Sequence, residues 1–151
     1  MNVIKTNDMP WAPGLDKGPF GIKKKGLVAG KLGVSLWELA AGKKSFPFHK
    51  HHVTEEALYV LSGKAKVRTI DGETAIGPGD FVSFPAGGTA HQIINDGSEP
   101  CVFVGISAGL GIDIVEYPDS GKIAASVGAP GAGKRFVFEE KSQVDYFKGE
   151  T

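Results

Sequence analysis

Turn-forming residues punctuate this sequence at short intervals, and no other feature constrains its fold as much. The 151 residues include 22 glycines and 9 prolines, which are scattered between short apolar runs instead of being gathered in one tract. Asp71-Gly72 supplies the positive φ angles of a two-residue hairpin turn, and Gly77-Pro78-Gly79-Asp80 marks a second turn. Short strands joined by tight turns are typical of an all-β chain, which is the fold class we predict.

The strand pattern occupies residues 31–117, without a convincing amphipathic helix between the strands. From Lys31 onward, apolar and polar residues alternate with the period of two that a half-buried strand shows. Further strands are predicted at 57–61, at 64–69 with a return strand after the turn, and at 81–84, 91–94, 101–107 and 112–117. Strands at this spacing favour a sandwich or a barrel, and the chain length suits one such domain.

Two flanking segments lack this regular pattern. Residues 1–30 are interrupted by Pro10, Pro13 and Pro19 and are predicted to form an irregular N-terminal arm. Residues 118–151 are rich in small residues, with one strand-like run at 135–138, and are predicted to be an extension that packs on the barrel or on a partner subunit. Because such a chain has a sheet edge to cover, we expect a homodimer.

Charge and composition exclude several classes of function. The chain has 17 Lys and Arg residues and 17 Asp and Glu residues, so no net field favours nucleic acid or an anionic membrane. No stretch is long and apolar enough to span a bilayer or to act as a secretion signal. Cys101 is the only cysteine, which excludes an intramolecular disulfide and suits a reducing compartment. We therefore expect a cytoplasmic protein that binds a small molecule, with neither nucleic acid nor membrane as a partner.

The histidines fall at two places, and three of the four lie in the run His49-Lys50-His51-His52. Residues two apart on a strand project from the same face, so His49 and His51 can both point into a barrel while His52 points away. A carboxylate from the pair Glu55-Glu56 and a ligand from a distant strand would complete a set of three nitrogens and one oxygen. Such a set suits Fe, Mn, Ni, Cu or Zn and leaves coordination positions for water or substrate.

Across residues 42–95 the sequence resembles both motifs of the cupin superfamily. The first reads Gly42, six residues, His49-x-His51, four residues, Glu56, six residues and Gly63. The second reads Gly79, five residues, Pro85-x-Gly87, three residues, His91, three residues and Asn95, and 15 residues separate the two motifs. Relative to the family pattern, one extra residue precedes His49 and another precedes His91, both in predicted loops.

The resemblance implies a double-stranded β-helix, the cupin jelly-roll barrel, with one divalent transition metal per chain held by His49, His51, Glu56 and His91. The spacing to Gly63 selects Glu56 over Glu55 as the carboxylate ligand. Glu55 and Tyr59 are then the candidates for a catalytic acid or base, although simple alternation places Tyr59 on the face opposite Glu56.

Cupins host several activities, so the resemblance leaves the reaction open. One hypothesis is a metal-dependent isomerase that acts on a sugar phosphate, and another is a dioxygenase or lyase that acts on a small organic molecule. The alternative is a non-catalytic protein that binds a small ligand and holds a structural metal. If Ala65 and Val67 face inward, the strand at 64–69 offers no cation to a phosphate. Basic residues that point into the barrel would favour the isomerase, and an apolar pocket would favour the oxygenase. A barrel filled by side chains would favour the binding protein.

Overall fold

The computed structural model describes residues 1–28, 30–109, 111–128 and 133–150, which consist almost entirely of strands and turns. The strands are β1 (Ala12–Lys17), β2 (Phe20–Val28), β3 (Leu32–Leu39), β4 (Lys50–His51), β5 (Glu55–Ser62), β6 (Ala65–Thr69), β7 (Gly72–Ile76), β8 (Phe81–Phe84), β9 (Gln92–Ile94), β10 (Cys101–Ala108), β11 (Ile112–Tyr117), β12 (Lys122–Val127) and β13 (Lys134–Glu139). The elements η1 (Thr6–Asp8), η2 (Pro118–Ser120) and η3 (Glu140–Ser142) are single 3₁₀ turns. In the part of the chain that the structure describes, no helix has the length and apolar character needed to cross a membrane. The predicted all-β class is confirmed.

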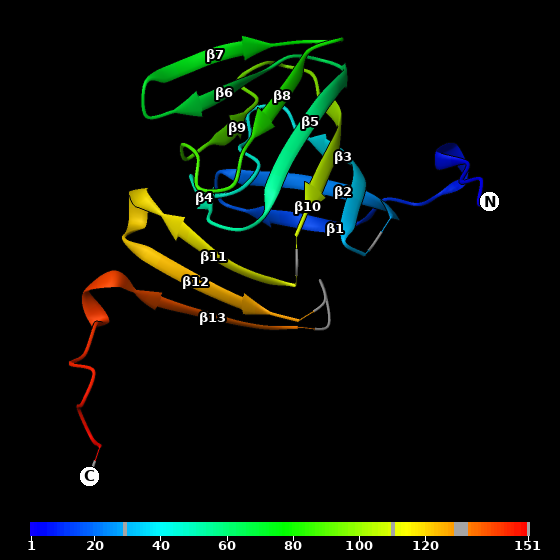
Figure 1. The fold of residues 1–151 in the computed structure, drawn as a ribbon. Coiled ribbons are helices and arrows are strands. Elements are labelled where there is room, and N and C mark those ends of the chain that lie inside the picture. Colours follow the sequence, from blue (N-terminus) through cyan, green and yellow to red (C-terminus); the bar gives the residue numbers. More distant parts are fainter. Residues whose placement is uncertain (29, 110, 129–132, 151) are drawn as a thin grey trace.

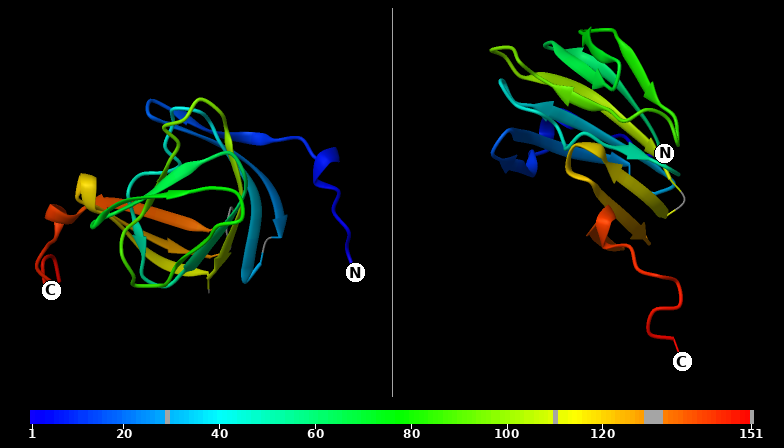
Figure 2. Two further views of the ribbon diagram at one scale, coloured as in Figure 1. Left: turned by 90° about the horizontal axis from the view of Figure 1, so that it is seen from above. Right: turned by 90° about the vertical axis from the view of Figure 1, so that its left-hand side faces the viewer.

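The strands form three hydrogen-bonded sheets (Figure 1). The largest has the order β1-β2-β3-β10-β5-β8, the second has the order β13-β12-β11-β4, and the third has the order β7-β6-β9. An antiparallel bridge between His49 and His91 joins the segment before β4 to the segment before β9, so the two smaller sheets continue into one another. Seen from above in Figure 2, the strands curve around a common axis. The result is a barrel whose two walls are the large sheet and the pair of smaller sheets.

The core consists of apolar side chains from both walls. Leu39 on β3, Val60 on β5 and Cys101 on β10 are fully buried. Val67 on β6 and Ile93 on β9 belong to the same buried cluster. Burying each Leu, Ile or Val side chain contributes about 1.5–3 kcal/mol before the entropy cost of ordering the chain is counted.

The predicted strands of the barrel agree closely with the observed ones. The predicted runs 81–84 and 112–117 coincide with β8 and β11, and 101–107 lies within β10. The predicted hairpin is formed by β6 and β7, but its two turn residues are Ile70 and Asp71 instead of Asp71 and Gly72. Gly72 begins β7 with a φ of 131°, whereas Asp71 does not have a positive φ. On β6 the period of two correctly places Ala65 and Val67 in the core, whereas on β11 the buried position between exposed Ile112 and Ile114 is occupied by Asp113.

The N-terminal arm is not irregular, contrary to the prediction. Residues 12–28 form β1 and β2, and β2 pairs along β3 from Ile22↔Leu39 to Val28↔Val34. The prolines that suggested irregularity occupy positions that tolerate them. Pro13 lies in β1, the edge strand of the large sheet, and Pro19 lies in the turn between β1 and β2.

The C-terminal extension is also more regular than predicted. The predicted run 135–138 lies within β13, but β12 was missed because its Ala124, Ala125 and Ser126 are too small to give an apolar alternation. β12 pairs with β11 on one side and with β13 on the other, so it extends one wall of the barrel. Ala124 is fully buried there.

Candidate metal centre

His49 and His51 flank Lys50 at β4, and both side chains line the interior of the barrel. β4 is held in place by β11, because His51 pairs with Val115. His52 points the other way, and its Nε2 lies 2.6 Å from Oε1 of Glu116 on the outer face. The separation of these histidines between two faces follows the predicted alternation.

Backbone pairing brings His91 beside His49. The amide of His91 donates to the carbonyl oxygen of His49 at 2.7 Å, and the amide of His49 donates to the carbonyl oxygen of His91 at 3.1 Å. The imidazole centroids of His49 and His91 are 4.7 Å apart, and those of His49 and His51 are 5.0 Å apart. Three imidazoles from two segments of the chain therefore form one cluster.

Glu56, on β5 of the opposite wall, completes the cluster. Its Oε2 lies 3.8 Å from Nε2 of His49, 3.3 Å from Nε2 of His51 and 3.4 Å from Nε2 of His91. Atoms bound to one transition metal ion at about 2.0–2.2 Å are separated from one another by about 3.0–3.5 Å, close to these values. The ligand atoms of His49, His51 and Glu56 also lie within 4.8 Å of one another. The cluster fits one divalent transition metal, whose identity this donor set leaves open.

Each imidazole is oriented by a contact on its other side. Nδ1 of His49 donates to the carbonyl oxygen of Pro47 at 2.8 Å, which leaves Nε2 to face Glu56. The ring of His91 stacks on Phe84 with a centroid distance of 3.6 Å and an interplanar angle of 10°, and its buried Nδ1 has no hydrogen-bond partner among the described residues. Packing alone thus orients His91.

Asp113 on β11 orients His51. Its Oδ2 accepts a short hydrogen bond from Nδ1 of His51, and its Oδ1 accepts hydrogen bonds from the amides of Val53 at 3.1 Å and Thr54 at 3.4 Å. A carboxylate behind a ligating imidazole fixes the tautomer and makes the imidazole a stronger ligand. Asp113 was not predicted from the sequence. The signal available was an acidic residue at an inward position of a predicted strand, alternating with exposed Ile112 and Ile114.

The electrostatics of the cluster favour the protonation states that bind a metal. Burial alone would raise the pKa of the Glu56 carboxyl, but the three imidazoles that face this carboxyl hold its pKa well below the ordinary value. Burial lowers the pKa of His91, although the contact with Glu56 opposes the shift. An ionised carboxylate and a neutral imidazole are the forms that coordinate a cation.

The two candidates for a catalytic acid or base lie elsewhere. Glu55 is exposed, and Tyr59 is 42% exposed on the outer side of β5. Neither side chain lines the cavity that contains His49, His51, Glu56 and His91.

The cluster lies in a cavity of about 1110 Å³, so side chains do not fill the barrel. The volume is large enough for a small organic substrate. Much of the wall is apolar, formed by Trp37, Phe46, Leu58, Phe84, Phe103, Ile106 and Val115.

Four basic side chains line the more exposed part of this cavity: Lys24, Lys31, Lys134 and Arg135. Lys24 lies over the ring of Trp37 at 5.3 Å, and Arg135 donates to the hydroxyl of Tyr117. Among the described residues, no carboxylate forms an ion pair with any of the four. Their charges are therefore available to an anionic ligand.

The basic residues of β6 face outward, as the alternation predicted. Lys66 pairs with Asp96 at 2.6 Å, and Arg68 pairs with Asp119 at 2.7 Å. Cations for the cavity come instead from β2, β13 and the residue before β3. The sequence analysis missed them because two of these three segments were assigned to irregular arms.

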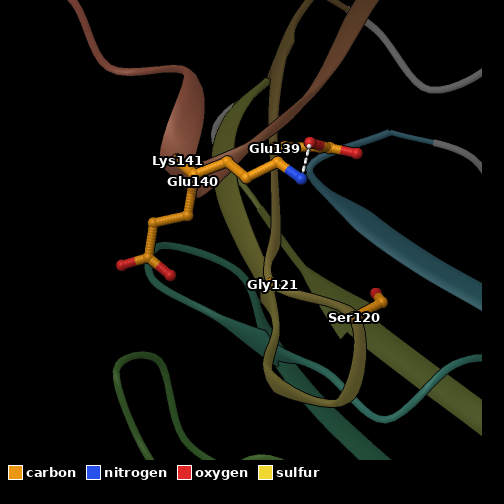
Figure 3. Close-up of a pocket in the computed structure, with 5 residues that line it drawn as sticks. All are labelled: Ser120, Gly121, Glu139, Glu140 and Lys141. Carbon is orange, nitrogen blue, oxygen red and sulfur yellow. Dashed lines mark ion pairs between the residues drawn. The ribbon is translucent and has the colours of Figure 1, made fainter.

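A separate, shallow depression of about 450 Å³ lies where the turn before β12 meets η3 (Figure 3). Its lining residues, Ser120, Gly121, Glu139, Glu140 and Lys141, are all exposed. Lys141 reaches back to Glu139 at 2.9 Å. It contains none of the clustered histidines and is not the candidate site.

An all-β barrel with three imidazoles and a carboxylate converging in its cavity defines a class of protein. A family model for the cupin domain matches residues 35–107. Together with the structural similarities below, this match shows that the chain belongs to the cupin superfamily. The double-stranded β-helix implied by the two sequence motifs is confirmed.

Several solved structures resemble the chain. A "putative sugar phosphate isomerase" from Acidithiobacillus ferrooxidans is 36% identical, with 76% of this chain and 70% of that chain covered and a TM-score of 0.68. A cupin-superfamily "sugar phosphate isomerase" from Silicibacter pomeroyi is 21% identical, with 94% and 95% covered and a TM-score of 0.80. A "predicted oxalate decarboxylase" from Thermotoga maritima is 20% identical, with 72% and 100% covered and a TM-score of 0.64. The last two similarities show the fold alone. No match was found among curated proteins.

Proposed function

We propose that this cupin is a metal-dependent isomerase that acts on a small sugar phosphate. One observation carries the proposal: three histidine Nε2 atoms converge on Oε2 of Glu56 in a cavity whose exposed part is lined by basic side chains. His49, His51, Glu56 and His91 would hold one divalent transition metal per chain. When bound, the metal would polarise a carbonyl oxygen of the substrate.

The basic residues would bind the phosphate. Arg135 offers a planar fork of N–H donors that matches phosphate oxygens, and Lys24, Lys31 and Lys134 offer point charges. All four lie in the exposed part of the cavity, whereas the clustered histidines are more buried. This arrangement would place the phosphate toward the solvent and the carbonyl end of the sugar toward the cluster.

Isomerisation also needs a group that moves a proton between adjacent carbon atoms. The carboxylates that line the cavity are Glu56 and Asp113, and Asp113 is already engaged by His51 and by two backbone amides. Glu56 is engaged as well, because the three histidines face its Oε2, and its lowered pKa makes it a weak base, so we assign the proton transfer to neither carboxylate. Glu55 and Tyr59 are less suitable, because they lie outside the cavity lining.

Isomerisation in D₂O tests the proposal. The protein is loaded separately with Mn, Fe, Ni and Zn and incubated with matched aldose phosphates and unphosphorylated aldoses, and ¹H NMR follows deuterium incorporation and ketose formation. We expect turnover of at least one phosphorylated sugar and little turnover of its unphosphorylated counterpart. No exchange with any metal and any sugar phosphate would rule the proposal out.

A matched pair of variants tests the role of the basic residues. Lys24→Gln removes a charge from the cavity, and we expect it to raise KM for the phosphorylated sugar by about tenfold, the loss of one charge-assisted contact. Lys66→Gln removes a charge that faces Asp96 outside the barrel, so KM should not change. Equal effects of the two substitutions would show that Lys24 has no specific role.

The apolar wall favours a second candidate, a dioxygenase or lyase acting on a small organic acid or aromatic compound. Trp37, Phe46 and Phe103 would enclose such a substrate beside the metal. Oxygen uptake by the Fe(II)-loaded protein, without deuterium exchange in sugar phosphates, would select the oxygenase. Metal binding with neither activity would select a ligand-binding protein with a structural metal.

A further inference from the structure

β13 is an exposed, apolar strand at the edge of a sheet. It ends the order β13-β12-β11-β4, and Figure 1 shows it on the side of β12 that faces away from the rest of the barrel. All six of its residues are exposed, and Phe136, Val137 and Phe138 are 55%, 55% and 47% exposed. Among the described residues it pairs with β12 alone. Natural proteins seldom leave such an edge uncovered, because its unpaired backbone groups invite another strand.

The sequence of β13 is complementary to itself about Val137. Phe136 and Phe138 are equidistant from this centre, and so are Arg135 and Glu139. In an antiparallel pair, residues directly opposite one another share a face of the sheet. Two copies of β13 paired about Val137 would place Phe136 against Phe138 of the partner subunit, and Arg135 against Glu139 of the partner subunit. The symmetry makes two aromatic pairs and two ion pairs.

The faces of the sheet are consistent with this pairing. Phe136 and Phe138 pair with Ala125 and Ile123 of β12, on the face that also carries exposed Ile114 of β11. An apolar outer face therefore reaches the edge of the sheet and would continue across it into a second copy.

We infer that a second copy of this chain docks on β13, antiparallel and centred on Val137, so that the two four-stranded sheets become one continuous sheet. The charge complementarity of Arg135 with Glu139 selects a second copy, because an unrelated strand would have to reproduce the same pattern. Lys134 and Arg135 line the cavity, so docking would fix the strand that carries them. In such a dimer Arg135 would pair with the partner subunit's Glu139, which leaves Lys24, Lys31 and Lys134 as the free cations of the cavity. This inference does not depend on the proposed reaction.

Charge reversal with sedimentation velocity tests the pairing in the full chain. We expect the wild type to be a dimer, and Arg135→Glu or Glu139→Arg to weaken dimerisation by about tenfold or more, because like charges would then face each other twice. The double variant R135E/E139R restores opposite charges and should dimerise within about threefold of the wild type. Glu139 also contacts Lys141 within its own chain, so a single substitution of Glu139 changes more than the contact between subunits. Restored dimerisation of the double variant is therefore the decisive outcome.

Disulfide cross-linking tests the register and does not require the dimer to be weakened. Val137→Cys places two thiols directly opposite each other, at about 4.5–5.5 Å between Cα atoms, which suits a disulfide. Phe136→Cys is the matched control, because its two copies would lie two residues out of register. The native Cys101 is buried and should not compete.

We expect rapid oxidation of the Val137→Cys variant to a cross-linked dimer and little cross-linking of the Phe136→Cys variant. A wild type that stays monomeric at about 100 μM overturns the inference, as does equal cross-linking of both variants. Single charge reversals that leave the dimer unchanged overturn it as well.

Discussion

The three imidazoles of the candidate metal centre are oriented by three different kinds of contact. A backbone carbonyl orients His49, stacking on Phe84 orients His91, and the Asp113 carboxylate orients His51. Of these contacts, only the one to His51 involves an ionisable group. Asp113 is therefore a positioning residue that acts through His51, and it can be removed without touching a ligand.

Asp113→Asn should weaken metal binding by about 10–100-fold, the usual cost of losing a carboxylate behind a ligating histidine. Competition with a chromophoric chelator measures the change in affinity. Glu116→Gln is the matched control, because Glu116 contacts His52 and Lys50 on the outer face. Equal losses in both variants would indicate a general effect on β11 instead of a role for Asp113.

The metal-free protein should lose stability as the pH falls. The folded state lowers the pKa of His91 from 6.5 and lowers that of Glu56 from 4.5, so the unfolded chain binds protons more readily at both groups. The contribution of His91 is complete above about pH 6.5 and is lost below it, and that of Glu56 is lost from about pH 4.5 downward. Urea unfolding at pH 8, 6 and 5 measures the effect. A free energy of unfolding that rises from pH 8 to pH 5 would contradict the assigned protonation states.

At the residue scale, the sequence identified the four side chains that the structure brings together, but not the residues around them. The four candidate ligands lie in motifs with fixed spacing, and strand alternation alone separates His49 and His51 from His52. Asp113 and the basic residues reach the cavity through pairing between strands that are distant in the sequence. The period of a strand's sequence shows which face of the strand a residue occupies, but not which other strands lie beside it.

At the scale of elements, the connection between β5 and β6 depends on Gly63. Its φ of +75° lies in the left-handed region, and a Cβ atom there would lie 2.2 Å from the carbonyl oxygen of Pro100. Both the backbone conformation and the close approach of the next segment therefore require glycine.

Gly63→Ala should lower the free energy of unfolding by more than about 3 kcal/mol, because the strained φ and the steric clash add together. Gly121→Ala should cost only about 1–2 kcal/mol. Gly121 has a φ of +55°, and nothing lies within 4 Å of where its Cβ would be. Urea denaturation of both variants measures the difference, and equal costs would show that the contact with Pro100 relaxes freely.

Two features of the sequence hid the strands that were not predicted. In β1 and β2, prolines at an edge and in a turn hid strands whose pairing is regular. In β12, small residues gave no alternation, although Ala124 is fully buried. β8 and β11 were predicted with their observed bounds, because turn-forming residues flank both strands: Gly79 and Pro85 around β8, and Gly111 and Pro118 around β11.

For the whole molecule, the C-terminal segment divides into a part that belongs to the wall and a part that does not. β12 buries Ala124 and pairs along all of β11, whereas residues 143–150 are exposed. A chain that ends at residue 117 should lose at least about 10 °C in Tm, because several kcal/mol of packing against β11 would disappear. A chain that ends at residue 142 should keep its Tm within about 3 °C. Equal Tm values for the two truncated chains would contradict this division.

Metal analysis of the purified protein tests whether His49, His51, Glu56 and His91 hold one metal ion in the barrel. The wild type, His49→Ala, Glu56→Ala and the outward-facing control His52→Ala are purified without added metal and analysed by inductively coupled plasma mass spectrometry. We predict about one divalent transition metal per chain in the wild type and in His52→Ala, and almost none in the other two variants. A wild type that holds no metal, even after reconstitution with Fe, Mn, Ni and Zn, would leave the barrel intact and contradict the metal centre.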